Sequence, residues 1–227
     1  MELNKAAFPT CSRLVLACLL IAPRAEQRSG DGGGWSPSSD STLEDEGPCN
    51  IDVLDRSSLS HQQFIERYAY SRPVILRGLT DNTKFRSLCS KSSLLQEYGD
   101  RRVRLSTANT YSYRKVDVRF QEYVDVFLRP QSNDALGSDT LYFFGDNNFT
   151  EWQGLFEHYE SPPYVLPHTS GAYSFGIAGP GTGVPFHWHG PGYSEVIYGR
   201  KVLYFPDRWW HATLNLDTSV FISTFLG

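Results

Sequence analysis

The sequence has little basic charge, few cysteines and no apolar run long enough to cross a membrane. Its 227 residues include 21 Lys or Arg and 25 Asp or Glu, which gives a formal net charge of −4. A protein that binds nucleic acid needs a basic surface to neutralise phosphates, so this balance argues against a nucleic-acid partner. The apolar run Leu14–Ala22 is far shorter than the about 20 residues that a bilayer requires.

The same run predicts a secretory signal peptide. Lys5 and Arg13 precede it, as positive residues precede the apolar core of signal peptides. Ala22 or Ala25 could mark the cleavage site, and the alternative is an uncleaved membrane anchor. We predict a cleaved leader over residues 1–25 and no stable membrane span afterwards.

The cysteines and one sequon fit an oxidising compartment. Of four cysteines, Cys49 and Cys89 lie beyond the leader. A remaining pair is a disulfide candidate in such a compartment, and the alternative is two unpaired thiols, one of them buried. Asn148 begins the sequon Asn-Phe-Thr, so we expect a glycan on Asn148.

What the chain does contain predicts one mainly β domain with flanking helices. Residues 26–48 are rich in Gly, Ser, Asp and Glu and predict a flexible tail. The domain covers 49–227, with a helical part at 49–165 and barrel strands at 171–227, where short apolar segments alternate with Gly and Pro. In the first part, periodicity and capping signals predict helices at 60–68, 92–98, 120–128 and 150–159, and strands at 74–76, 103–105 and 141–144.

Three histidines form a candidate metal site. His187 and His189 are two positions apart on a predicted strand, so their side chains share one face. His211 follows on another strand, and neutral imidazoles bind Fe, Zn and Cu. The alternative is that these are ordinary strand residues, one of them directed inward and hydrogen-bonded.

The spacing around these histidines resembles the two cupin motifs. The first is Gly181-x5-His187-x-His189 with a later glutamate and glycine, and the second is Pro206-x4-His211-x3-Asn215, with Arg where cupins have Gly. RPVILRG, GRK and FPDRWWH resemble the JmjC (jumonji) branch of the cupins over residues 49–227. The resemblance implies a double-stranded β-helix, Fe(II) and 2-oxoglutarate as cofactors, and hydroxylation of proteins or demethylation of lysines.

The resemblance also assigns roles to particular residues. By position, His187 and His211 are metal ligands, and His189 stands where the family has a carboxylate. Glu195 is either a substitute ligand or a surface residue. Lys201 falls where the family places the lysine that pairs with 2-oxoglutarate, whereas Val184 stands where a threonine often helps to hold it.

A family segment is missing from this chain. Relatives carry several dozen residues between GRK and the strand that leads to the distal histidine, whereas here Lys201 runs directly into Val202-Leu203-Tyr204-Phe205. We infer an internal deletion, such as alternative splicing produces, and an incomplete barrel. Either VLYFP turns back after GRK and moves His211 out of reach of His187, or it keeps its family place and leaves a hole in the sheet.

Two functions follow from these patterns. The one we favour is a glycosylated JmjC-fold protein of the secretory pathway, in the endoplasmic reticulum lumen, that regulates unidentified proteins by binding them, without oxygenase turnover and with or without a metal. The other is an Fe(II)/2-oxoglutarate-dependent protein hydroxylase. Histone demethylation conflicts with a secretory leader, and binding of a sugar or small molecule by a metal-free barrel stays open.

Overall fold

A computed structural model describes residues 32–35, 49–108, 114–130 and 137–227 of the chain. The predicted leader lies outside these residues, as does most of the predicted tail. The strands are β1 Asp52–Asp55, β2 Val74–Arg77, β3 Arg102–Thr107, β4 Lys115–Arg119, β5 Leu141–Phe144, β6 Gly171–Ala178, β7 Gly183–His187, β8 Gly192–Val196, β9 Lys201–Phe205, β10 His211–Leu214 and β11 Ser219–Leu226. The helices are α1 His61–Arg67, α2 Thr83–Leu88, α3 Lys91–Tyr98, α4 Phe120–Glu122 and α5 Gln153–Phe156, and a turn of π-helix at Tyr123–Phe127 continues α4.

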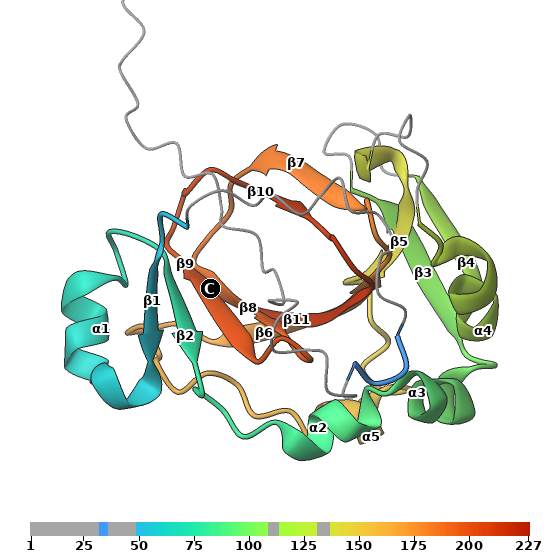
Figure 1. Ribbon diagram of the computed structural model, residues 1–227, viewed down its shortest axis with the longest axis horizontal. Helices are drawn as coiled ribbons and strands as arrows, with labels where there is room; N and C mark the ends of the chain where they lie inside the picture. Colours follow the sequence, from blue (N-terminus) through green and yellow to red (C-terminus); the bar gives the residue numbers. More distant parts are fainter. Residues whose placement is uncertain (1–31, 36–48, 109–113, 131–136) are drawn as a thin grey trace, which may run out of the picture.

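Two sheets face each other across the molecule (Figure 1). The large sheet has nine strands in the order β1-β2-β9-β8-β11-β6-β5-β3-β4, and the small sheet pairs β10 with β7. Helices α2, α3 and α5 lie on the outer side of the large sheet, away from the small one. The prediction of a mainly β fold with flanking helices is confirmed, although residues 49–165 also contribute five of the strands to the large sheet.

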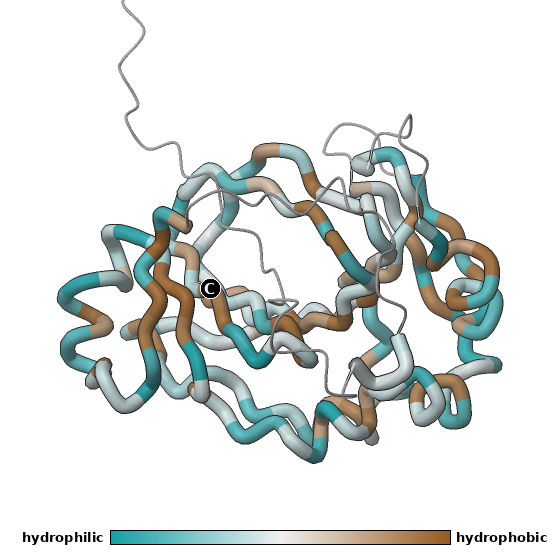
Figure 2. Tube along the Cα trace, viewed as in Figure 1, coloured by the Kyte–Doolittle hydropathy of each residue, from teal (hydrophilic) through white to brown (hydrophobic). Residues whose placement is uncertain are grey.

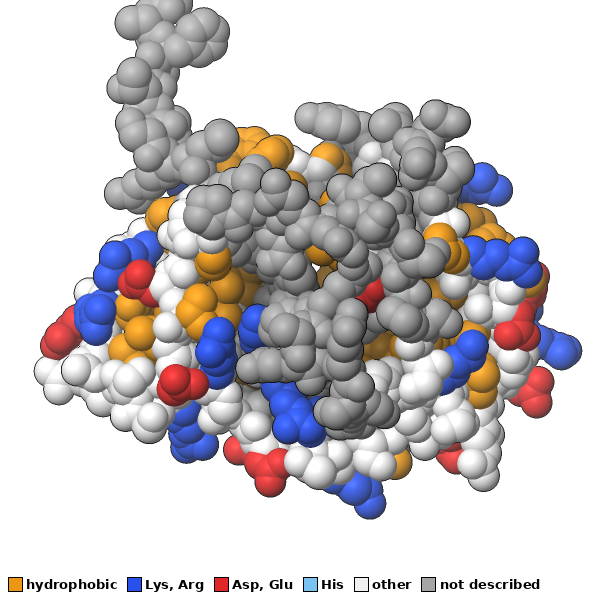
Figure 3. Space-filling model, viewed as in Figure 1, with side chains coloured by type: hydrophobic (Ala, Val, Ile, Leu, Met, Phe, Trp, Pro, Cys, Tyr) orange, Lys and Arg blue, Asp and Glu red, His pale blue; other side chains and the backbone are white. Residues whose placement is uncertain are grey.

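Apolar side chains on the outer face of the large sheet hold these helices. Phe85 of α2 and Leu94 of α3 are fully buried against Phe175 and Ile222 of the sheet, beside Trp152. A second cluster packs Phe64 of α1 on the other half of the sheet. Figure 2 shows hydrophobic stretches along β1 and β2 and a hydrophilic connection from β2 to α2, and Figure 3 shows Lys and Arg interspersed with Asp and Glu around the described part of one face.

Local sequence signals explain why α1 begins where it does. The Ser60 hydroxyl accepts a hydrogen bond from the backbone N–H of Gln63, and the Gln63 side chain accepts one from the backbone of Ser60. This reciprocal pair is the predicted capping box and satisfies two backbone donors that the helix itself leaves open. The predicted strands at 74–76, 103–105 and 141–144 are also confirmed, as β2, β3 and β5.

The prediction of one flexible tail over 26–48 is wrong for residues 32–35. Trp35 is 8% exposed, belongs to the main core, and donates its indole N–H to the Cys89 backbone oxygen at 3.0 Å. Gly33 accepts a hydrogen bond from the first residue of α3, and its φ of +61° suits glycine. A Cβ at Gly33 would meet the Tyr198 ring at 2.1 Å, so this segment is fitted closely to the domain.

Cys49 and Cys89 form no disulfide in the structure, which has the alternative instead: two unpaired thiols, one of them buried. Cys89 follows α2 and is fully buried in the main core, whereas Cys49 is exposed and its thiol donates to the Ile51 backbone oxygen. Burial raises the pKa of the Cys89 thiol well above its ordinary value. A disulfide needs Cα atoms within about 7 Å of each other, and the packing of α2 holds Cys89 inside the core instead.

Thiol labelling of the folded protein tests this difference. Iodoacetamide reacts with the thiolate, so Cys49 is expected to be alkylated under native conditions and Cys89 only after unfolding. Peptide mapping by mass spectrometry reads out both positions. A peptide pair linked through Cys49 and Cys89 would contradict the structure.

The shortened chain closes its sheet with a hairpin. After β8 the chain turns at 197–200 and β9 pairs back along β8, with Val196 opposite Lys201 and Gly192 opposite Phe205. The other edge of β9 pairs with β2, so no strand position is left open there. VLYFP therefore does turn back after GRK, as the first alternative predicted, and the fold is a double-stranded β-helix whose small sheet has two strands among the described residues.

Candidate metal centre

The three histidines of the predicted site come together at one end of the small sheet. His187 is the last residue of β7 and His211 the first of β10, and the strand register places them directly opposite each other. His189 follows two residues after His187. One ligand atom from each imidazole lies within 4.8 Å of the others, so the expectation that the hairpin moves His211 out of reach is wrong. Five residues, 206–210, connect the large sheet to the small one and suffice to return His211 to β7.

The backbone prepares each imidazole as a ligand. The Nδ1 atoms of His187, His189 and His211 lie 2.9, 2.7 and 2.8 Å from the carbonyl oxygens of Pro185, Gly190 and Trp209. A carbonyl oxygen only accepts, so each Nδ1 carries the proton and donates. Each Nε2 is then left with its lone pair, which is the arrangement that metal-ligating histidines show.

Burial favours the neutral form of His211 and His189. It lowers the pKa of His211 to about 4 and also lowers the pKa of His189, with the backbone hydrogen bonds opposing the shift and the neighbouring histidines adding to it. Phe205 stacks on His211 with ring centroids 5.3 Å apart. Phe225 packs edge-on against His189 at 5.1 Å. The aromatic packing both orients the ligands and removes water from one side of them.

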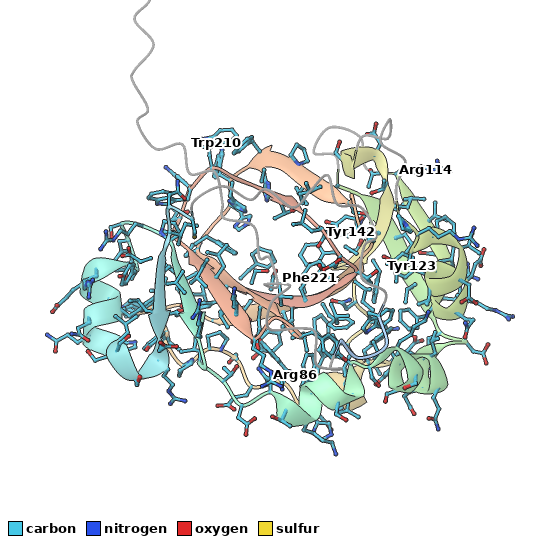
Figure 4. The ribbon with its side chains drawn as sticks, in the orientation of Figure 1. Arg86, Arg114, Tyr123, Tyr142, Trp210 and Phe221 are labelled. Atoms are coloured by element: carbon cyan, nitrogen blue, oxygen red, sulfur yellow. The ribbon has the colours of Figure 1, made fainter. Side chains whose placement is uncertain are left out.

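A cavity of about 230 Å³ extends from the histidines between the two sheets. Alternate residues of β8, β9 and β11 face it, because strand side chains alternate between the two faces of a sheet. Figure 4 shows Tyr142 and Phe221 in the space between the sheets and Trp210 at its outer margin. The remaining lining is mostly aromatic and aliphatic, with a few hydroxyl and amide groups: Phe144, Thr182, Gly183, Val184, Ser194, Val196, Leu203, Phe205, Ala212, Thr213, Leu214, Asn215, Ser219, Ser223 and Phe225.

Glu195 does not join the histidines. Its neighbours Ser194 and Val196 line the cavity, so Glu195 faces the other side of the large sheet and is 3% exposed. Asn82 donates to both carboxylate oxygens at 3.2 Å, and the Tyr159 hydroxyl donates to one of them at 3.2 Å. The structure thus supports neither the substitute ligand nor the surface residue: the carboxylate joins two loops to β8.

Glu195 gives the stability of the protein a pH dependence. Desolvation raises its pKa, and the hydrogen bonds from Asn82, Tyr159 and Thr80 only partly offset that. A folded-state pKa above the unfolded value stabilises the protein at low pH, and that contribution is lost as the pH rises through the folded pKa. Glu195→Gln removes the charge and keeps one side-chain oxygen as an acceptor. The stability of the variant relative to the wild type should therefore increase as the pH rises above about 4.3. Urea unfolding of both proteins from pH 4 to 8 measures the difference, and a constant or falling difference would contradict this assignment.

The other predicted site residues take different places. Val184 lines the cavity, where it offers no hydrogen-bond donor from its side chain. Lys201 starts β9 opposite Val196 and Arg77; it shares a face with Leu203 by alternation but is not part of the cavity lining. Asn148 is exposed in the loop after β5.

Sequence reasoning missed the aromatic neighbours of the histidines and the partners of Glu195. Phe205 and Phe225 share a strand face with other lining residues, and the alternation within VLYFP and SVFISTFL was the available signal. Asn82 and Tyr159 lie 113 and 36 residues from Glu195, and no local pattern connects them.

Two facing sheets with a histidine cluster at one end of the smaller sheet form a double-stranded β-helix. No family model matches the sequence. JmjC domain-containing protein 8 of Homo sapiens is 52% identical over 262 residues, which cover 95% of this chain and 98% of that protein. Its counterpart in Rattus norvegicus is 53% identical over 243 residues, with 86% and 90% covered. The chain therefore belongs to the JmjC domain-containing protein 8 family.

More distant similarities are weaker. A lysine-specific demethylase of Arabidopsis thaliana is 26% identical over 145 residues, which cover 54% of this chain and 14% of that protein. The ribosomal oxygenase YcfD of Escherichia coli has a TM-score of 0.43 at 18% identity, over 74% of this chain and 51% of that one. Another structure of YcfD, in complex with cobalt and 2-oxoglutarate, has a TM-score of 0.40 at 16% identity, with the same two shares covered.

The alignment with the human relative bears on the missing segment. It spans 262 residues, whereas this chain has 227, so at least 35 residues of the relative have no counterpart here. Such a difference supports an internally shortened chain. Its place after Lys201 and its origin in splicing stay predictions.

Proposed function

We propose that this chain is a metal-binding member of the JmjC domain-containing protein 8 family that acts by binding other proteins rather than by 2-oxoglutarate turnover. The observation that carries the proposal is the combination of three assembled imidazoles with a cavity that offers no Lys or Arg among its described lining residues. The three imidazoles favour a metal, and the lack of Lys and Arg in the described lining argues against binding of 2-oxoglutarate.

The donor set fits a transition metal. Three imidazoles within 4.8 Å of one another, each held through Nδ1, suit Zn(II), Fe(II) or Cu(II), and they would leave further coordination positions open. Bound there, the metal would supply a Lewis acid at the end of the cavity. His187, His189 and His211 would hold it, and Phe205 and Phe225 would keep the ligands oriented.

2-Oxoglutarate does not fit the same lining. It brings two carboxylates, of which a bound metal would take only one. The other would be buried in the cavity without a cationic partner, which costs several kcal/mol. Lys201 lies outside the lining and Val184 provides no side-chain donor. The lining therefore argues against a reaction that uses 2-oxoglutarate.

The place of action is part of the proposal. The apolar run at Leu14–Ala22 favours entry into the secretory pathway, and the exposed sequon at Asn148 suits glycosylation in the endoplasmic reticulum lumen. Among the described residues, no helix has the length and apolar character needed to cross a bilayer. We expect regulatory binding to other proteins in that lumen.

A protein hydroxylase using Fe(II) and 2-oxoglutarate is the second candidate. It is favoured by the assembled histidines and by the position of Lys201 on the same sheet face as Leu203. The hydroxylase requires Lys201 to enter the cavity when 2-oxoglutarate binds.

Metal content and 2-oxoglutarate turnover, measured on the same preparation, test the proposal. We expect about one metal ion per chain and no more succinate, with Fe(II) and 2-oxoglutarate supplied, than from the His187→Ala variant. Succinate production that depends on His187 would favour the hydroxylase. A folded protein that retains no metal would contradict the metal site.

A further inference from the structure

The cavity beside the histidines has two different ends. At the histidine end, Phe205 and Phe225 both lie opposite Gly192 of β8. At the far end, Val196 lies opposite Phe221, and Phe221 packs on Phe144 with ring centroids 5.3 Å apart. A ligand in this space would have an apolar body between aromatic rings and one end directed toward the imidazole Nε2 atoms.

The lining offers hydrogen bonds but little charge. Among its described residues, the histidines are the only side chains able to carry a positive charge, and none is acidic. Several polar groups are already engaged: the Thr213 hydroxyl accepts from the Val184 backbone, and Asn215 donates to the Thr182 oxygen. Ser194 and Ser223 face each other 3.4 Å apart from neighbouring strands and can still serve a neutral ligand.

The volume sets the size of the ligand. A cavity of about 150 Å³ lined by apolar side chains accommodates benzene, and this one measures about 230 Å³. It therefore accommodates one six-membered ring with a short substituent. Specific small-molecule sites combine an apolar lining with a few polar groups in this way.

We propose that the cavity binds a neutral, ring-sized ligand with a single hydrogen-bonding or metal-ligating end, and that it excludes dicarboxylates such as 2-oxoglutarate. The direction of the polar end rests on the proposed metal site, but the preference for a neutral body rests on the lining alone. The apolar body displaces water from between the sheets, while the polar end reaches the histidines or the pair Ser194 and Ser223.

Three small probes of known charge test this preference. Benzamide is neutral, benzoate has the same ring with one negative charge, and glutarate is a dianion with the carbon chain length of 2-oxoglutarate. Each is titrated into the full chain by calorimetry, first in metal-free protein and then with Zn²⁺ added. We expect the Kd of benzamide to be at least about tenfold lower than the Kd of benzoate or glutarate in metal-free protein, because each anion gives up hydration without a cationic partner.

A charge introduced into the lining should reverse the preference. Val184→Arg places a guanidinium at a position that faces the cavity, and we expect it to tighten benzoate and glutarate binding at least about tenfold. Val165→Arg makes the same exchange at a position that is 59% exposed and should leave all three affinities unchanged. If Val184→Arg does not fold, the wild-type selectivity decides alone.

The outcomes separate this inference from the metal proposal. Tighter binding of glutarate or benzoate than of benzamide, or no benzamide binding by folded protein, would overturn the neutral-ligand site. Metal content is measured separately, so its loss would overturn the metal site and leave the probe selectivity standing.

Discussion

Replacing His211 by alanine is expected to lower metal affinity by a factor of about 100 or more, because even the loss of a supporting hydrogen bond to a metal ligand costs 10–100-fold. His211 is one of three imidazoles whose ligand atoms lie within 4.8 Å of one another. Its loss would leave only His187 and His189 to hold the ion. Metal per protein after dialysis, read by mass spectrometry, measures the effect.

His158→Ala is the matched control for this experiment. His158 lies outside the described histidine cluster, so its replacement should leave metal content unchanged. Circular dichroism establishes that the His211→Ala variant keeps its sheet. Full metal retention by a folded His211→Ala protein would show that the ion sits elsewhere.

Replacing Trp35 by alanine is expected to destabilise the domain by about 3–5 kcal/mol, the usual cost of truncating a buried large aromatic side chain. Trp35 is 8% exposed, packs in the main core, and donates to the Cys89 oxygen. The truncation leaves a cavity against α2 and α3 and an unsatisfied carbonyl. Urea unfolding followed by circular dichroism gives the free energy of unfolding.

Trp210→Ala provides the comparison. Trp210 is 44% exposed, and its truncation should cost less than about 1 kcal/mol. Equal effects of the two substitutions, or no effect of Trp35→Ala, would mean that residues 32–35 do not anchor to the domain.

The docking of Trp35 shows where composition fails as a guide. A segment of Gly, Ser and acidic residues predicts a solvated chain. Its average composition conceals Trp35, an apolar side chain that packs in the core. The signal that could have been used was a single tryptophan in that polar segment, since burying an indole offsets the entropy of ordering a few residues. The site that Trp35 enters is formed around Cys89, 54 residues further along the chain, so no local pattern predicts it.

Local patterns predicted the elements better than they predicted the contacts between them. The capping box at Ser60 and the strand β2 depend on neighbouring residues and appear where expected. Whether Cys49 can pair with Cys89 depends on how far apart the fold places them. The position of Glu195 depends on which face of the sheet its place in β8 gives it. A shift of the predicted strand by one residue would move Glu195 to the other face of the sheet. Strand ends are the least certain part of a sequence-based prediction.

The histidine site lies between these cases. The spacing of His187 and His189 predicted a shared direction, and the cupin-like motifs predicted His211 as their partner. What the sequence could not give was the path of the chain after Lys201. The hairpin from β8 to β9 satisfies the backbone hydrogen bonds of both strands at once, and 206–210 then bring His211 back to β7.

X-ray absorption at the metal edge of the Zn-loaded full chain tests whether His187, His189 and His211 bind the metal together. We expect three imidazole nitrogens about 2.0–2.1 Å from the metal, with the number falling to two in the His211→Ala variant. A shell with fewer than three imidazoles in the wild type, or one that includes a protein carboxylate, would contradict it.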